Sequence, residues 1–242
     1  MSDGNIRTNA GGQTSGLAKV GIWSLELRFG NPSQAGEAVA ELEQLGFDAV
    51  WIPGGIGGDL LSDVARLLDA SRRVTIGTGV LNIYKHAPAD IGKWWHGRSA
   101  ADRARLMLGL GVSHAPLIGA AYGKPLAAMS SYLDELDKAG IPAARRCLAA
   151  LGPKMLALSR DRTAGSHPYL VGPAHTAMAR KILGPHALLV PEQAVILETD
   201  PARAREMART ALELYLHLPN YLNNWRRTGF SEEDVTLSLI HI

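Results

Sequence analysis

The sequence predicts an α/β protein whose parallel strands form most of a (β/α)8 TIM barrel, with the last βα unit missing from this chain. Short, continuously apolar segments alternate seven times with amphipathic segments, a pattern typical of a parallel sheet covered by helices. The competing fold is an open dinucleotide-binding sheet. Its G-x-G-x-x-G motif is absent after the first expected strand, which runs into "WSLELRFGNPS", and the later "GGIGGD" does not match it.

The expected strands are the short apolar segments of this alternation. They cover residues 17–25, 47–53, 72–84, 105–113, 145–151, 167–172 and 192–200.

Each expected strand is followed by an amphipathic helix. The helices cover residues 31–46, 58–71, 87–104, 125–140, 152–165, 173–184 and 201–218. The first has a full set of boundary signals: Asn31 can cap it, Pro32 suits its first turn and Gly46 suits its end. No linker rich in Pro, Gly or Ser divides the units, so we expect one domain over residues 18–235.

The two ends of the chain do not follow the pattern. Residues 1–17 are polar and rich in Gly, Ser and Asn, without the apolar centre of a signal peptide, and we expect a disordered lead-in. Residues 236–242 end in "LSLIHI". One codon choice for these six residues resembles a sequencing adapter, so we hypothesise a non-native tail on a gene fragment; the alternative is a genuine apolar tail.

Composition excludes several classes of protein. With 25 Lys and Arg against 23 Asp and Glu, the net charge of +2 gives no reason to expect nucleic acid or an anionic membrane as partner. The single cysteine, Cys147, excludes an intrachain disulfide framework and a cysteine-based zinc site, and favours a cytoplasmic location. No apolar run reaches the roughly 18 residues of a membrane span.

Ligands of such barrels bind at the carboxyl ends of the strands. The residues expected there are aromatic, small or weakly polar: Trp23, Ser24, Pro53, Gly54, Gly55, Gly79 to Tyr84, His86, Ser113, His114, Leu151, Gly152, Gly172 and His175. They include no cluster of carboxylates and no metal-ligand spacing, so we expect no metal site. A large planar cofactor, which would itself supply the difficult chemistry, suits this set better.

Six segments in order along residues 18–235 resemble the luciferase-like monooxygenase superfamily, and within it the coenzyme F420-dependent oxidoreductases. They are "FDAVWIPGG", "RRVTIGTGVLNIY", "RLMLGLGVSHAP", "TAGSHPYLVGPAHT", "PEQAVILETDPARAR" and "LPNYLNNWRRTGF". The resemblance implies a (β/α)8 barrel, a homodimer when full length, and F420 as cofactor, with FMN as the alternative.

The resemblance also implies roles for the strand ends. A non-prolyl cis peptide at Gly79-Val80 would back the central ring of the cofactor, and Asn82 would hydrogen-bond the ring edge. Without the resemblance, the glycines indicate only a bulge that bends the strand.

A second cofactor contact is implied where "AALGPK" begins a helix. Ala150, Leu151, Gly152 and Lys154 would hold the cofactor phosphate, since helix N-termini bind anions; the alternative is a simple helix-start signal. Ser113, in the turn after the fourth strand, would donate to a cofactor oxygen, and Gly109 and Gly111 would keep the backbone there accessible.

His114 is the first candidate for a proton donor or a substrate contact, because an imidazole does either near neutral pH. The expected substrate pocket contains Trp23, Gly54, Tyr84, His86, Tyr122 and His175. His167 is expected to begin a strand, on the face that serves stability.

One departure from the family matters for the substrate. The acidic residue and histidine that several F420 enzymes carry after strand two are replaced by Pro53-Gly54-Gly55, which leaves room for a bulkier or more apolar substrate. We therefore expect hydride transfer between deazaflavin C5 and an unknown organic molecule. The alternatives are an FMN-dependent monooxygenase and a cofactor-free binding barrel or inactive fragment.

Overall fold

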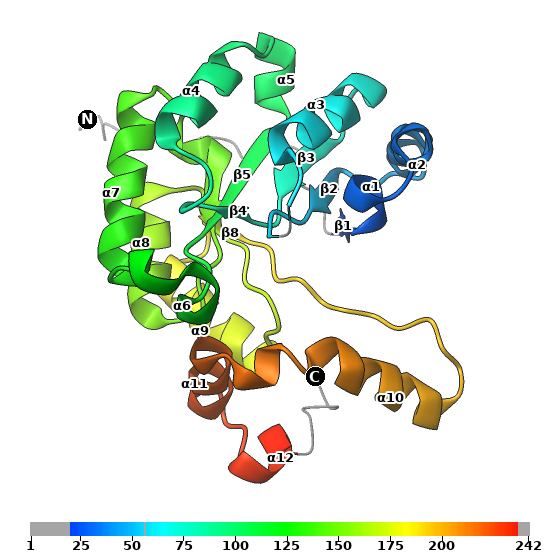
Figure 1. The fold of residues 1–242 in the computed structure, drawn as a ribbon, viewed down its shortest axis with the longest axis vertical. Coiled ribbons are helices and arrows are strands. Elements are labelled where there is room, and N and C mark those ends of the chain that lie inside the picture. Colours follow the sequence, from blue (N-terminus) through cyan, green and yellow to red (C-terminus); the bar gives the residue numbers. More distant parts are fainter. Residues whose placement is uncertain (1–19, 56, 237–242) are drawn as a thin grey trace, which may run out of the picture.

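The sheet is a curled layer of parallel strands. A computed structural model describes residues 20–55 and 57–236, and its eight strand segments follow the order β1-β2-β3-β5-β6-β7-β8, with β4 beside β5 (Figure 1). They are β1 (Ile22–Trp23), β2 (Ala49–Ile52), β3 (Thr75–Thr78), β4 (Leu81–Asn82), β5 (Leu106–Gly111), β6 (Arg146–Leu148), β7 (Gly165–Ser166) and β8 (Leu188–Leu189). Among the described residues no strand joins β8 to β1. The sheet is therefore an incomplete (β/α)8 barrel, as predicted.

Twelve α-helices lie within the described residues, and several of them cover the outer face of this sheet (Figure 1). They are α1 (Glu26–Phe29), α2 (Pro32–Gln44), α3 (Leu60–Ala70), α4 (Pro88–His96), α5 (Ala100–Ala104), α6 (Ala115–Ile118), α7 (Pro125–Lys138), α8 (Pro153–Arg162), α9 (Pro173–Leu183), α10 (Pro201–Leu212), α11 (Pro219–Arg227) and α12 (Glu232–Thr236). Three 3-10 turns join them: η1 (Gly119–Ala121), η2 (Ala143–Arg145) and η3 (Tyr215–His217). None of the helices in the described ranges is long and apolar enough to cross a bilayer.

The boundary signals of α2 act as the sequence predicts. The Asn31 side chain accepts hydrogen bonds from the N–H groups of Ser33 and Gln34, and Pro32 is the first helical residue. Gly46 ends the helical segment with a positive φ of 92°, which costs glycine little.

The third predicted helix, residues 87–104, is two helices. The chain leaves the helical conformation after His96, and α5 starts again at Ala100, where the Ser99 hydroxyl accepts the N–H of Asp102. A serine that can cap a new helix therefore divides a segment that reads as one amphipathic helix.

Two apolar layers hold the fold together. Outward-facing strand residues such as Val50, Ile76, Leu108 and Leu148 pack against the helices. Inside the barrel lies a separate cluster of Ala49, Trp51, Met107 and Cys147, with Trp23, Ala164, Leu188 and Val190 against it. This alternation of inward and outward side chains follows from the two-residue period of a strand.

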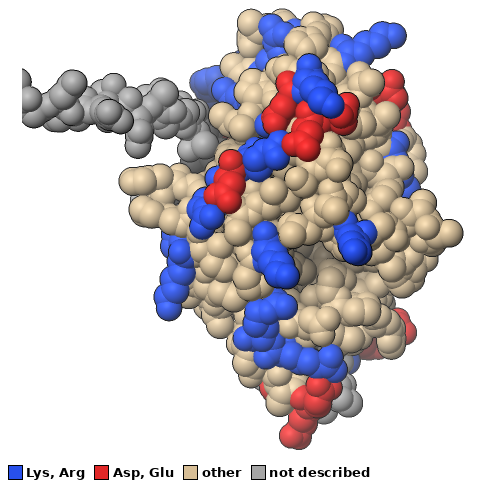
Figure 2. Space-filling view, turned by 90° about the vertical axis from the view of Figure 1, so that its left-hand side faces the viewer, with Lys and Arg blue, Asp and Glu red and all other residues tan. Residues whose placement is uncertain are grey.

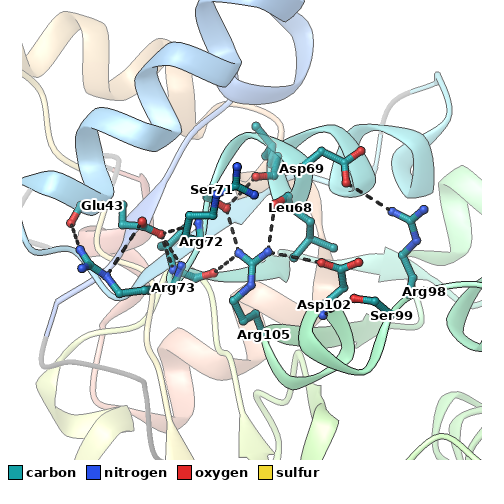
Figure 3. A network of polar contacts seen from close by, with 12 residues as sticks. Glu43, Leu68, Asp69, Ser71, Arg72, Arg73, Arg98, Ser99, Asp102 and Arg105 are labelled. Carbon is teal, nitrogen blue, oxygen red and sulfur yellow. Dashed lines mark hydrogen bonds and ion pairs between the residues drawn. The ribbon is translucent and has the colours of Figure 1, made fainter.

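A polar network fixes the chain just before the amino-terminal ends of β3 and β5 (Figure 3). One carboxylate oxygen of Glu43 accepts the N–H groups of residues 72–74, at distances of 3.0, 2.6 and 2.8 Å. Arg105 donates to the Ser71 hydroxyl at 2.9 Å and to the Leu68 carbonyl at 2.9 Å. This end of the barrel is therefore held together by hydrogen bonds from side chains to the backbone.

The last two predicted strands are wrong in position. β7 and β8 end at Ser166 and Leu189, before the predicted segments 167–172 and 192–200 begin. Residues 194–200 carry no regular structure and run outward to α10, with Val195 77% and Leu197 101% exposed (Figure 1). Apolar composition alone favoured a strand here, yet these side chains find no core to enter.

The predicted terminal segments fall mostly outside the described residues. The lead-in, residues 1–17, and residues 237–242 of the predicted tail are not described. Thr236, the first residue of that predicted tail, is the last residue of α12.

Candidate active site

The third strand is interrupted at the rim of the barrel by a bulge of residues 78–81. The Gly79-Val80 peptide bond is cis, as the family resemblance predicted. The Gly79 N–H donates to the Ile52 carbonyl at 2.8 Å, and Trp23 Nε1 donates to the Gly79 carbonyl at 3.1 Å. The bulge is thus bonded to both preceding strands.

Glycines on the neighbouring strands make room for Val80. A Cβ at Gly54 would collide with the Val80 carbonyl, and a Cβ at Gly111 would lie 2.6 Å from Val80 Cγ2. Val80 also occupies the space beside Gly109, since a Cβ there would lie 3.2 Å from Val80 Cγ1. The prediction that Gly109 and Gly111 leave accessible backbone is therefore wrong, and Gly54 supports the bulge instead of leaving open space.

Directly beneath the bulge lies His167, which the sequence placed at the wrong end of the barrel. Its ring stacks on Trp51 with centroids 4.4 Å apart, and a Cβ at Gly79 would lie 3.0 Å from its Nε2. Its Nδ1 is 2.7 Å from the Val190 carbonyl. The side chain is buried, and this burial lowers its pKa despite the hydrogen bond to Val190. His167 is a neutral part of the barrel interior and not a residue of the stability face.

Several predicted pocket residues gather beside β4. Asn82 is buried, and its side-chain oxygen accepts the Tyr84 N–H at 2.9 Å. His86 Nδ1 lies 3.1 Å from the Asn82 carbonyl. The rings of Tyr84 and Tyr122 lie 5.8 Å apart. The side-chain and backbone oxygens of Asn82 are therefore both engaged within the loop. Only the NH2 group of the Asn82 side chain remains to bond the edge of a cofactor ring.

His114, after β5, reaches helix α11. Its Nδ1 lies 3.1 Å from Asn220 Oδ1, and its ring lies 5.7 Å from that of Tyr221. Burial lowers the pKa of His114, and the bond to Asn220 offsets part of this shift. Ser113, just before it, has a positive φ of 57°. The predicted proton donor thus also ties a loop at the rim to α11.

The amino ends of α8 and α9 form a second group. Both helices start with a Gly-Pro pair, and no side chain caps either one. A Cβ at Gly152 or Gly172 would meet nothing within 4 Å, so both ends are open to an approaching group. Lys154 is exposed beside them. Uncapped N–H groups, open space and a nearby cation together suit an anion such as phosphate.

Ala150, predicted to hold the phosphate, and His175, predicted for the substrate pocket, serve the protein instead. Ala150 is buried and its N–H donates to the Leu148 carbonyl at 2.9 Å. His175 is fully buried, with Nε2 3.0 Å from the Leu151 carbonyl. Burial lowers the His175 pKa, and the positive charge of Arg227 adds to this. The expectation that His175 lines an open pocket is wrong; it supports the Leu151 loop from below.

The basic side chains on this side of the molecule surround a depression. Figure 2 views the face on which α6, α7 and α8 lie in Figure 1, and shows Lys and Arg side chains spaced around a hollow. A positive rim of this kind attracts anionic ligands.

Helix α11 and η3 cover part of the rim with aromatic rings. Trp225 Nε1 donates to the Leu170 carbonyl at 3.0 Å. Tyr215 lies 5.1 Å from both Tyr169 and Tyr221, ring centre to ring centre, in edge-on contacts. Burial raises the pKa values of Tyr169 and Tyr221, so both hydroxyls are protonated near neutral pH. This aromatic roof consists of Tyr169, Tyr215, Tyr221 and Trp225.

Glu192 is a residue of the rim that the sequence did not identify. It follows β8, its N–H donates to the Pro168 carbonyl at 2.9 Å, and it pairs with Tyr169 in a parallel bridge. Burial raises its pKa to about 7. Because the last strand was predicted at residues 192–200, Glu192 was assigned to the beginning of a strand, at the opposite end of the barrel. Leu188 and Val190 both lie inside the barrel, and side chains two residues apart on a strand share a face. This spacing was the signal that could have identified Glu192 as a residue of the rim.

Within the described ranges, no three His, Cys, Asp or Glu side chains lie close enough together to hold a metal ion.

Comparison with known proteins agrees with this geometry. Residues 8–139 match the family model described as luciferase-like monooxygenase, and the chain belongs to that family. The relatives and structural neighbours that it resembles are named as oxidoreductases and monooxygenases.

One sequence relative matches part of this chain. A protein of Mycobacterium tuberculosis that carries the provisional name coenzyme F420-dependent oxidoreductase is 30% identical over 120 residues. That match covers 48% of this chain and 33% of the relative, so this chain corresponds to only a third of the relative's length.

Two solved structures share the fold. The coenzyme F420-dependent tetrahydromethanopterin reductase of Methanopyrus kandleri superposes with a TM-score of 0.67 at 14% identity, over 88% of this chain and 76% of that one. The oxygenating constituent of 3,6-diketocamphane monooxygenase from Pseudomonas putida, in complex with FMN, gives 0.55 at 12% identity, over 86% and 76%.

Proposed function

We propose that this chain is the barrel of a coenzyme F420-dependent oxidoreductase, which transfers a hydride between C5 of the deazaflavin and an organic substrate. The observation that carries the proposal is the bulge at Gly79-Val80. It is bonded to β1 and β2 and fitted into Gly54 and Gly111 at the rim where barrel enzymes bind ligands. A fixed, side-chain-poor backbone segment of this kind suits the face of a flat ring.

The chain also suits the other end of such a cofactor. Deazaflavin and flavin cofactors both carry a phosphate on the tail of the ring. The uncapped start of α8, the open space at Gly152 and the charge of Lys154 are the features that a phosphate requires. Leu151 and Gly152 would hold the phosphate there.

The protein's own contribution would be orientation and exclusion of water. The bound deazaflavin supplies the hydride carrier. The bulge would support the ring, the amide group of Asn82 would bond its edge and Ser113 would donate to a cofactor oxygen. The aromatic roof would shield the site from solvent. Such positioning supplies up to about 7–11 kcal/mol of a reaction barrier when the reactants are well oriented.

F420 is preferred to FMN because the sequence relative that matches almost half of this chain is named for dependence on F420. The FMN alternative has its own support, since a structural neighbour was solved with FMN bound. In that case the enzyme would be a flavin-dependent monooxygenase, in which the reduced cofactor activates oxygen.

Titration of the purified protein with F420 and with FMN, followed by cofactor fluorescence, tests the proposal. We expect saturable binding of F420 that is at least tenfold tighter than binding of FMN. Tight FMN binding without F420 binding would replace the proposal with the monooxygenase. No binding of either cofactor by folded protein would favour a cofactor-free binding barrel or an inactive fragment.

A further inference from the structure

The side chain of Glu192 faces the interior of the barrel. Leu188 and Val190 pack into the inner apolar cluster, and Glu192 continues their alternation. The parallel ladder also continues, since the N–H of Val190 donates to Ser166 and that of Glu192 to Pro168, both at 2.9 Å. Side chains two residues apart on a strand share a face. Glu192 therefore lies above Val190, on the inner side of the rim.

The opposite partner in this layer is Tyr169. The two residues form a parallel bridge. One layer deeper, His167 Nδ1 bonds the Val190 carbonyl at 2.7 Å, and His167 itself lies beneath the bulge at Gly79. The carboxyl group and the tyrosine are thus one layer above the residues that touch the proposed ring support.

The surroundings of Glu192 are aromatic. Its carboxylate has no ion pair and no hydrogen bond to a side chain among the described residues. The titratable groups facing it are Tyr169 after β7, Tyr215 in η3 and Tyr221 in α11. His114 lies next in line beside Tyr221, and His167 lies one layer below. A carboxyl group held among neutral side chains at a ligand-binding rim suits proton exchange.

We propose that Glu192 is the group that exchanges a proton with the substrate at this site, with Tyr169 positioned alongside it. This inference rests on the proposed function. Bound F420 would supply the hydride, which would form a bond to the carbon of a polarised double bond, and in the same reduction the carboxylic acid O–H of Glu192 would break. Its proton forms the new bond at the other atom of that double bond. The carboxylate that remains regains a proton from water, and oxidation runs the same steps in reverse.

The substrate class follows from the same surroundings. Tyrosine rings surround Glu192, and the inner cluster that lies deeper in the barrel is apolar. A neutral, largely apolar molecule with a polarised C=C, C=N or C=O bond fits this wall. The pKa of about 7, raised by burial, keeps both the acid and the carboxylate populated at neutral pH.

The first measurement uses the protein without cofactor. Carbodiimide and an amine label protonated carboxyl groups, and mass spectrometry gives the extent at each residue. We expect labelling of Glu192 to fall with a midpoint near pH 7. Glu206, an exposed carboxyl group on α10, is the control residue. A Glu192 midpoint in the ordinary range overturns the proposal.

The second measurement places the group in the site. Saturating F420 is expected to reduce labelling of Glu192 at least tenfold and to leave that of Glu206 unchanged. The dissociation constant of F420 is then measured for the wild type and for Glu192→Gln. The wild-type value divided by the variant value should rise about fivefold between pH 6 and pH 8, because an ionised carboxyl group opposes an anionic cofactor. For Glu206→Gln the ratio should stay flat, and any titration of F420 itself cancels in both ratios.

These outcomes separate the two proposals. If F420 binds but gives neither protection of Glu192 nor a pH-dependent ratio, the role of Glu192 is wrong and the proposed function stands. If wild type and both variants fail to bind F420 while remaining folded, the proposed function is wrong and the proton-exchange role falls with it.

Discussion

A negative charge at position 152 is expected to weaken cofactor binding without affecting the fold. Gly152 caps α8 with φ −88° and ψ 155°, a conformation open to any residue, and a Cβ there meets nothing within 4 Å. Asp and Asn are both good N-caps, of similar size. The Gly152→Asp and Gly152→Asn variants therefore differ only in one charge.

The magnitude follows from the distance between that charge and a phosphate at the helix start. Two unit charges 4 Å apart interact by about 4 kcal/mol near a protein surface. Partial exposure of Gly152 and screening by salt reduce this. We expect about 1.4–2 kcal/mol to remain, which is a ten- to thirtyfold weaker affinity for Asp than for Asn.

The assay is F420 binding by fluorescence at low and high ionic strength, with thermal unfolding of both variants as the check on folding. The gap between the variants should narrow as salt is added. The same pair at Gly172, which caps α9 and is equally open, distinguishes the two helices. Equal affinity of Gly152→Asp and Gly152→Asn would show that no anion binds at α8 and would refute the reasoning.

Three further substitutions test the packing around the site. Gly54→Ala should destabilise the protein by about 1–3 kcal/mol and weaken cofactor binding, because the new Cβ collides with the Val80 carbonyl. Gly55→Ala, where a Cβ meets nothing, is the control. Equal denaturation midpoints for the two variants would contradict this reasoning. Glu43→Gln should cost about 1–3 kcal/mol in denaturant unfolding, since its carboxylate accepts three backbone N–H groups. Burial raises the Glu43 pKa, but the three N–H groups and Arg73 bring it below its ordinary value. The stabilisation by the Glu43 carboxylate is therefore complete above the ordinary pKa of a glutamate and is lost as the pH falls through its lowered pKa in the folded protein. The difference in unfolding free energy between wild type and Glu43→Gln should therefore shrink in acid. A difference that does not change with pH would refute this. Trp225→Phe should cost about 1 kcal/mol and loosen α11 through loss of the bond to Leu170, measurable as faster hydrogen exchange in α11 with β2 unchanged.

The strand–helix alternation and the bulge could be predicted from the sequence for different reasons. Alternation is a local property of side-chain spacing, and it located β2, β3 and β5 to within a few residues. The cis bond at Gly79-Val80 came from the family resemblance, because two glycines at a strand end are equally consistent with a simple bulge.

The end of the barrel at which a residue lies could not be predicted where the strands are short. β7 and β8 have two residues each, and the apolar segments beyond them read as the strands themselves. That shift moved His167 and Glu192 from the ligand-binding rim to the opposite end. Contacts between distant residues, such as Val80 with Gly54 and His114 with Asn220, had no sequence signal.

Helix α10 stands away from the sheet, and none of its residues is buried (Figure 1). Its three arginines, Arg203, Arg205 and Arg209, present peptide bonds that trypsin recognises on a helix with little to oppose local opening. Cleavage there would divide the chain into two pieces that stay together, because the downstream piece remains anchored through Tyr221 and Trp225 on Leu170. A nicked preparation would therefore migrate as two bands under denaturing conditions while still eluting as one native species.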